Sequence, residues 1–265
     1  GANVTYSRFW DWEQYKPRFS NSWDEYRNSI WHRVGYVNWG YEAVGRFNSW
    51  EEIANYPIDN DRKGNRTVVP GDIKYKDQNN DGVINYLDER PIGYRVDSTP
   101  TLNFGINLAA SWKGFDLAMD WTGSGMTSWQ QCYETARPFQ NDGNSPDEVL
   151  KDAWHLSDIW DANSELIPGK YPMLRLNSDE TSAYDKSTFW LHNVRYIKLR
   201  NLEFGYTLPK NWLGRSGISN LRVFVSGTNL LTLSNLSVMD PECVSDNGLD
   251  YPPMRVINLG VNLKF

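Results

Sequence analysis

The chain has 265 residues, a formal net charge of −6 and 13 tryptophans. It lacks an apolar segment of the roughly 20 residues that a transmembrane helix needs, which excludes a helical span. A membrane-spanning β-barrel is not excluded, because half of each barrel strand is polar. The mild acidity and the absence of a basic stripe exclude a nucleic-acid-binding protein. The chain begins with neither Met nor a signal-peptide pattern, so we interpret it as a fragment or as a mature piece of a longer protein.

The first hundred residues show only weak periodicity. Residues 35–47 are a candidate strand, and residues 50–56 are a candidate short helical turn. No further element is predicted in this part of the chain.

Residues 77–88 have the ligand spacing of a calcium-binding loop. Oxygen-bearing side chains occupy positions one, three, five, nine and twelve, and Gly82 stands at position six, where such a loop turns sharply. A backbone carbonyl at position seven completes the set, and calcium prefers hard oxygen ligands of this kind. The predicted ligands are Asp77, Asn79, Asp81, Val83, Asn85 and Asp88.

A second interpretation of this segment stays open. Position twelve is Asp rather than the bidentate Glu, and no helix is predicted on either side of the loop. An Asx-rich turn held by side-chain to backbone hydrogen bonds would use the same residues. Structural Ca²⁺ is therefore a candidate cofactor, with the ordinary Asx turn as the alternative.

Strict alternation of apolar and polar side chains begins at residue 101. It runs to residue 112 and resumes between residues 115 and 122, as expected for two strands with one apolar face each. Lys113 and Gly114 between them suit a two-residue hairpin turn, because glycine accepts positive φ. Trp112 and Phe115 flank this turn, and such aromatic residues are typical of membrane interfaces.

Three more strands are predicted towards the end of the chain, at residues 193–208, 221–233 and 254–265. A break in the alternation near Asn201 indicates a β-bulge in the first of them. In the terminal strand, one face carries Ile257, Leu259, Val261, Leu263 and Phe265, and the other carries Asn258, Gly260, Asn262 and Lys264. A half-polar last strand that ends in an aromatic residue suits an outer-membrane barrel.

The connections between the strands alternate in length. Residues 113–114 and 209–220 are short connections, whereas 48–100, 123–192 and 234–253 are long. Outer-membrane barrels have short periplasmic turns and long extracellular loops. We therefore predict an all-β fold, an antiparallel transmembrane β-barrel segment with long extracellular loops. The alternative is a soluble β-sandwich.

Five aromatic residues in the second long connection are candidate substrate-binding residues, because flat rings stack on sugar faces. They are Trp129, Tyr133, Trp154, Trp160 and Trp190. For most of them the alternative is that they pack the loop against itself or against a partner. Cys132 and Cys243 cannot form a CxxC site, but they could pair in an oxidising envelope.

Nothing in the sequence indicates catalysis. The chain has only three histidines, His32, His155 and His192, with no nucleophile elbow and no metal-binding histidine pair. The chain is therefore predicted not to be an enzyme.

Several segments that follow one another along the chain point to one family. PGDIKYKD at residues 70–77 and NDGVI at residues 80–84 are similar to a stretch of the SusC/RagA family of TonB-linked outer-membrane transporters, and WKGFDL at 112–117 resembles its "YKGFDL" hairpin. The other similar blocks are residues 44–47, 49–53, 196–202, 205–209, 218–232 and 251–255.

This resemblance implies that residues 1–265 are the C-terminal portion of a barrel of about 22 strands in the bacterial outer membrane. It implies import of oligosaccharides or peptides. The implied partners are a SusD-like surface lipoprotein, the rest of the receptor, TonB, the lipid bilayer and the cargo. This chain carries neither the plug domain nor the TonB box of that family. The alternative function is a secreted, calcium-stabilised carbohydrate-binding or adhesion β-domain, which would stay soluble without detergent.

Overall fold

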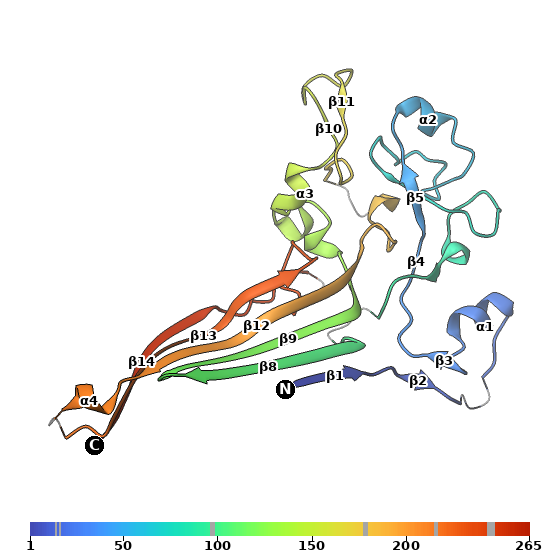
Figure 1. Cartoon of the computed structure of the whole chain (residues 1–265). Coiled ribbons are helices and arrows are strands. Elements are labelled where there is room, and N and C mark those ends of the chain that lie inside the picture. Colours follow the sequence, from blue (N-terminus) through green and yellow to red (C-terminus); the bar gives the residue numbers. More distant parts are fainter. Residues whose placement is uncertain (14, 16, 96–98, 177–179, 215–216, 243–246) are drawn as a thin grey trace.

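The main element of the protein is one antiparallel sheet of six strands in the order β1-β8-β9-β12-β13-β14 (Figure 1). The computed structural model describes residues 1–13, 15, 17–95, 99–176, 180–214, 217–242 and 247–265. The six strands are β1 Ala2–Tyr6, β8 Leu102–Trp112, β9 Phe115–Gln130, β12 Leu191–Thr207, β13 Asn220–Ser234 and β14 Val256–Lys264. Since every neighbouring pair is antiparallel, successive connections lie at alternate ends of the sheet.

The register of the sheet produces the two faces that the alternation predicts, because paired residues point to the same side. One row of in-register partners across four neighbouring strands is apolar, and consists of Leu117, Phe204, Val225 and Leu259. The adjacent row, on the opposite face, consists of Ala118, Glu203, Ser226 and Asn258. The sheet therefore has one apolar and one mainly polar face.

The turn between β8 and β9 has the predicted two residues. Lys113 and Gly114 have φ angles of 49° and 90°, positive at both central positions as in the type I′ hairpin turn. A Cβ atom on Gly114 would lie 2.7 Å from the backbone carbonyl oxygen of Thr207, so the close approach of β12 also requires glycine here.

Two strand boundaries differ from the prediction. β9 continues to Gln130, so the connection after it is 131–190 rather than 123–192. Small and polar residues at 123–128 hide the alternation, yet β9 pairs with β12 as far as Gln130 and Leu191. The predicted bulge is confirmed by a register shift between Leu199 and Asn201.

The region before β8 also differs from the prediction. β1 pairs with β8, so the first long connection is 7–101 rather than 48–100. The candidate strand at 35–47 is replaced by two short strands, β4 Trp39–Gly40 and β5 Ala43–Arg46, which pair with different partners. The helical turn at 50–56 is confirmed as α2 Trp50–Ala54, whose first turn is capped by the Ser49 side chain.

The remaining elements are short and lie in the connections. In the first long connection they are β2 Trp10–Asp11, α1 Ser22–Asn28, β3 Arg33–Val34, β6 Ile73–Tyr75, η1 Tyr86–Asp88 and β7 Arg90–Pro91. Later ones are η2 Tyr133–Thr135, η3 Gln140–Asp142, α3 Asp147–Lys151, β10 His155–Leu156, β11 Leu166–Ile167, η5 Ser182–Tyr184 and α4 Lys210–Leu213. Among the helices that the structure describes, none has the length and apolar character needed to cross a membrane.

Most of the hydrophobic core lies in the connections, and a smaller cluster joins Trp129 of β9 and Val194 of β12 to Leu236. Residues 39–95 and 131–190, which we call the two-loop unit, stand beyond the end of the sheet opposite to α4 and the C-terminus (Figure 1). Their shared core includes Tyr41, Ile73, Tyr75, Ile84, Val149, Tyr171, Tyr184 and Trp190. Because both connections contribute to this core, they fold as one body.

Polar contacts also join the two connections. Tyr75 donates a hydrogen bond from its hydroxyl to the carbonyl oxygen of Ser182 at 2.7 Å. The fully buried carboxylate of Asp72 pairs with the guanidinium of Arg175. Burial raises the pKa of Asp72, and the attraction of Arg175 opposes that rise. The charge of Asp72 therefore depends on a partner from the other connection.

We expect Asp72→Ala to loosen the two-loop unit. It leaves the mostly buried Arg175 without its carboxylate, and breaking a buried ion pair on one side costs about 3–5 kcal/mol. Hydrogen exchange of residues 39–95 and 131–190 should accelerate together, while the sheet keeps its protection. Asp147→Ala is the matched control, because the Asp147–Lys151 pair is 77% and 71% exposed and is worth roughly 0.5 kcal/mol at most. Equal exchange in the two variants would contradict this prediction.

Candidate functional site

The polar face of the sheet carries hydrogen-bonded charges from three strands. Arg222 on β13 donates from Nε to Asp116 on β9 at 3.0 Å, and its Nη2 donates to Glu203 on β12 at 2.6 Å. Asp120 on β9 accepts from Asn107 at 2.8 Å and from Asn201 at 3.1 Å. These side chains satisfy one another's hydrogen-bonding groups. The polar face therefore suits contact with water or with other polar groups.

The connection between β13 and β14 folds back onto two other charged residues, Lys198 and Arg200 of β12. Lys198 on β12 is fully buried, and its ammonium donates to Asp240 at 2.7 Å and to Glu242 at 2.9 Å. Glu242 also accepts from Arg200. Burial acts to raise the pKa of Glu242, but the hydrogen bonds from Lys198 and Arg200 outweigh it and lower the pKa. We call these four residues the loop clamp.

The calcium-like segment forms a tight loop anchored in the two-loop unit. Carboxylate oxygens of Asp77, Asp81 and Asp88 all lie within 4.8 Å of one another. The backbone N–H groups of Asn80 and Gly82 donate to Asp77 at 2.6 and 2.8 Å. The sequence thus brings three of the predicted ligands together.

The other three predicted ligands engage in the same internal bonding. Asn79 accepts from the backbone N–H of Asp81 at 3.0 Å, and Asn85 accepts from that of Leu87 at 2.9 Å. The Asn85 amide donates to the carbonyl oxygen of Val83 at 3.2 Å. Such bonds occur in an Asx turn and hold a cation loop in shape, so both interpretations stay predictions.

The five candidate aromatic residues lie in different environments. Trp129, Trp154 and Trp190 are buried, and Trp190 stacks between Tyr171 and Tyr184 with ring centroids 5.8 and 5.5 Å away. By contrast, Tyr133 and Trp160 are 51% and 90% exposed. Tyr133 belongs to η2, whereas Trp160 lies between β10 and β11. Trp154 and Trp190 are buried in the second long connection, whereas Trp129 lies in β9 and packs with Val194 and Leu236. Of the five rings, the two exposed ones offer a free face.

The predicted cysteine pair stays a prediction. Cys132 is partly buried immediately before η2. Cys243 lies outside the residues that the structure describes.

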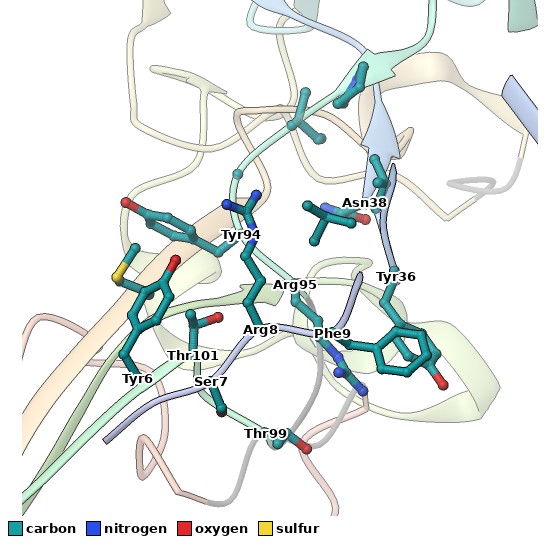
Figure 2. A pocket seen from close by; sticks show the side chains of 17 residues that line it. Tyr6, Ser7, Arg8, Phe9, Tyr36, Asn38, Tyr94, Arg95, Thr99 and Thr101 are labelled. Atoms are coloured by element: carbon teal, nitrogen blue, oxygen red, sulfur yellow. The ribbon is translucent and has the colours of Figure 1, made fainter. Parts of the chain in front are cut away.

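A cavity of about 520 Å³ near the end of β1 was missed by the sequence analysis (Figure 2). It is formed by residues 6–9, 34–38 and 91–95 with a few others, including Arg8, Tyr36 and Arg95. These segments are short and lack regular alternation, so no pattern in the sequence indicated that they meet.

Comparison with known proteins identifies the family, although no family model matches the chain. TonB-dependent receptor P3 of Formosa agariphila is 30% identical over 241 residues, which are 84% of this chain and 22% of the relative. TonB-dependent receptor P26 of the same organism is 28% identical over 241 residues, 85% of this chain and 22% of the relative. The chain thus spans about a fifth of the length of these relatives.

Solved structures share the fold. The RagAB peptide importer in the open-open state superposes with a TM-score of 0.61 and 24% identity, covering 100% of this chain and 26% of that one. Another RagAB peptide transporter structure gives a TM-score of 0.56 and 22% identity over 90% of this chain and 24% of that one. The chain belongs to the TonB-dependent receptors, as the resemblance predicted. It is not an enzyme, which is also as predicted.

We expect Lys198→Met to release the loop clamp. The substitution keeps most of the side-chain volume but leaves the partly buried Asp240 and Glu242 without the ammonium. Removing one partner of a buried ion pair costs roughly 3–5 kcal/mol. Protection of residues 235–242 against hydrogen exchange should fall. Lys264→Met, on the exposed Lys264 of β14, is the matched control and should leave this protection unchanged.

The same clamp predicts a pH dependence. The pKa of Glu242 is lower in the folded protein than in the unfolded chain, so its ionised carboxylate stabilises the folded state. This stabilisation is fully present above the unfolded pKa of about 4.3 and is lost as the pH falls through the lower folded pKa. Protection factors of residues 235–242 should therefore decrease in the parent below about pH 4. Lys198→Met should show a much smaller decrease, and an identical decrease in both proteins contradicts the assignment.

Proposed function

We propose that this chain is a barrel segment of an outer-membrane TonB-dependent transporter that imports oligosaccharides or peptides. A continuous apolar sheet face, opposite a polar face that a connection covers, is the observation that carries the proposal. The TonB-dependent receptor relatives support outer-membrane nutrient import in general.

Strand length supports a membrane position. β8 has 11 residues and β14 has 9, and a tilted transmembrane strand needs about 9–11. On the apolar face, Leu259 and Ile257 are 80% and 69% exposed. An exposed apolar surface of this extent marks contact with a membrane or a partner. Lipid contact explains why this face has no packing partner within the described residues.

Aromatic side chains support the position of one membrane interface. Phe115 packs against Tyr206 and Phe204 with ring centroids 4.4 and 5.8 Å apart. Trp112, beside the tight turn, is 68% exposed. A band of aromatic rings at the level of the lipid headgroups is a property of outer-membrane barrels. We assign this end, with its short connections, to the periplasmic side.

The two-loop unit then stands on the extracellular side, where a SusD-like surface lipoprotein is the proposed partner. The plug, the TonB contact and the other strands of an approximately 22-stranded barrel are proposed to come from the rest of the receptor. The solved RagAB structures are named for a peptide importer. For this chain we keep both cargo classes, oligosaccharide and peptide.

The alternative, a secreted calcium-stabilised carbohydrate-binding or adhesion domain, is less well supported. A soluble sandwich would need a second layer over the apolar face, and the described residues provide none. The receptor relatives also favour transport. Extraction separates the two proposals, because the secreted domain would remain soluble without detergent.

We expect Leu259→Arg to reduce the amount of receptor in the outer membrane. A cation on the lipid face costs about 2–4 kcal/mol at the membrane midplane. Asn258→Arg is the matched control, because Asn258 lies next to Leu259 on the opposite face. Surface labelling of the complete receptor in cells measures both. Equal surface levels of the two variants, at equal synthesis, would contradict the membrane assignment.

The same cells test transport. Energy-dependent uptake of labelled oligosaccharide or peptide pools should fall with Leu259→Arg, in proportion to the receptor that is lost, and should disappear in a strain without the receptor. Uptake of both pools that is unchanged by removal of the receptor would contradict the proposed function.

We also propose that the loop at residues 77–88 binds a hard divalent cation, with Ca²⁺ as the best fit. Its ligands would be Asp77, Asn79, Asp81, Val83, Asn85 and Asp88. The nearby lysines Lys74 and Lys76 pair with Glu52 and Glu42. Clustered like charges repel one another, and a bound cation would remove that repulsion. The role would be structural, since the fully buried Ile84 connects the loop to the core of the two-loop unit.

We expect Ca²⁺ to raise the melting temperature of the parent receptor in detergent. A ligand at 100 times its Kd stabilises by about 2.7 kcal/mol, and Asp81→Ala should lose most of this shift. Asp147→Ala, an exposed carboxylate outside the loop, should keep it. If Ca²⁺ shifts neither the parent nor Asp147→Ala, the segment is an ordinary Asx turn.

A further inference from the structure

A groove of about 1000 Å³ lies at the end of the sheet next to the two-loop unit. Phe104, Gly123, Ile197 and Leu233 form one row of in-register partners across β8, β9, β12 and β13. Gly123 follows Leu117 of the apolar row by six residues on β9, and an even separation places both on one face of the sheet. Phe104, Ile197 and Leu233 therefore continue the apolar face, and all three line the groove.

The groove forms where β9 carries glycine between large side chains of its neighbours. A Cβ atom on Gly123 would lie 2.2 Å from Cζ of Phe104, so the Phe104 ring lies across β9 at this position. Gly125, two residues further along, faces the same side and lines the groove. The nearest atom to a Cβ on Gly125 would be Cβ of Arg195 at 3.9 Å, an ordinary contact distance. The sheet surface over Gly125 is therefore hollow, with Arg195 at its rim.

Arg195 brings a positive charge to the rim of this groove. The pairing of β12 with β9 shifts between Val194 and Tyr196, and such an irregularity re-aims the side chain at that point. Asn235 holds the Arg195 backbone: its Oδ1 accepts from the Arg195 N–H at 2.9 Å, and its N–H donates to the Arg195 carbonyl oxygen at 3.3 Å. The Arg195 side chain itself is exposed. The guanidinium is thus anchored beside the groove and open to its surroundings.

The position of Arg195 along β12 corresponds to the level of lipid headgroups. Tyr206 belongs to the aromatic group that we assign to the periplasmic interface, and it lies 11 residues from Arg195 on β12. At about 3.3 Å per residue and a tilt of roughly 40°, this separation is at most about 28 Å along the membrane normal, close to the apolar band of about 25 Å. Tyr94, which also lines the groove, is 43% exposed, as expected for an aromatic residue at an interface. The groove therefore extends from the outer headgroup level into the apolar band.

We propose that this groove binds a membrane lipid with an anionic phosphate headgroup. One acyl chain lies over Gly125, along Phe104 and Ile197, and the phosphate accepts hydrogen bonds from the guanidinium of Arg195. Guanidinium groups bind phosphate through paired, charge-assisted hydrogen bonds. Because lipid tails are as apolar as the groove, the headgroup contact provides the selectivity and the groove determines where the chain lies. The proposal rests on the membrane position given under the proposed function.

Native mass spectrometry of the complete receptor in neutral detergent tests this proposal. The probes are dipalmitoyl phosphatidylglycerol, dipalmitoyl phosphatidylcholine, which has the same chains without net charge, and glycerol 1-phosphate, which has no chain. We expect phosphatidylglycerol to bind at least about fivefold more tightly than either other probe, because one arginine near an anionic lipid headgroup contributes at this scale. Equal binding of phosphatidylcholine overturns the anionic headgroup. Equal binding of glycerol 1-phosphate overturns the acyl-chain groove.

Variants localise the binding. Arg195→Gln should weaken the binding of phosphatidylglycerol by about fivefold or more, because the amide has no charge. Gly125→Leu should weaken it as well, because the leucine occupies the place of the acyl chain. The φ angle of Gly125 lies outside the left-handed region, so this variant is expected to fold. Arg66→Gln, at an exposed arginine of the two-loop unit, is the matched control and should bind like the parent.

Unchanged melting curves check that these variants fold. Parent-like binding by Arg195→Gln overturns the headgroup contact, and parent-like binding by a folded Gly125→Leu overturns the groove. A receptor that resides in the outer membrane but shows no preference for phosphatidylglycerol loses this site and keeps the proposed function. A receptor that stays soluble without detergent contradicts the membrane position itself, and with it both proposals.

Discussion

Alternation of apolar and polar side chains along six paired strands is the constraint on which the rest of this structure depends. Because the period is two, each strand directs one set of side chains to each face, and the antiparallel register aligns these sets from β1 to β14. A soluble sheet would bury its apolar face in a core. Here Leu259 and its neighbours stay exposed, so the protein must place its core elsewhere. The two-loop unit contains most of that core.

The loops therefore behave as a folded body rather than as simple connections. Residues 39–95 and 131–190 share aromatic packing around Trp190 and a buried ion pair between Asp72 and Arg175. The third connection instead returns to the sheet, where Asp240 and Glu242 bind Lys198. These contacts are made by charged groups that desolvation penalises unless they are paired, which ties the position of each loop to its partner. These pairings hold the long connections in defined positions relative to one another and to the sheet.

The features whose physical signal is local could be predicted from the sequence. Period-two alternation located the long strands, Lys113-Gly114 located the tight turn, and the phase break near Asn201 located the bulge. The features that depend on distant partners could not be predicted. The small residues at 123–128 look like a loop, but β12 pairs with them. Trp129, Trp154 and Trp190 have the composition of a binding surface, and only the packing of distant segments around them shows that they are buried. The spacing of Asp77, Asp81 and Asp88 predicted their convergence, because that geometry lies within one loop.

The cavity near β1 shows why the remaining chemistry could not be read in advance. Arg8 follows the first strand, Asn38 precedes β4, and Arg95 follows β7, so their meeting depends on the pairing of β1 with β8 and of β4 with β7. Each residue alone is an ordinary polar side chain of an exposed connection. Together these segments line a cavity of about 520 Å³ near the end of β1. The sheet thus serves as a frame: it has one apolar and one mainly polar face, and its loop end brings together residues that are far apart in the sequence.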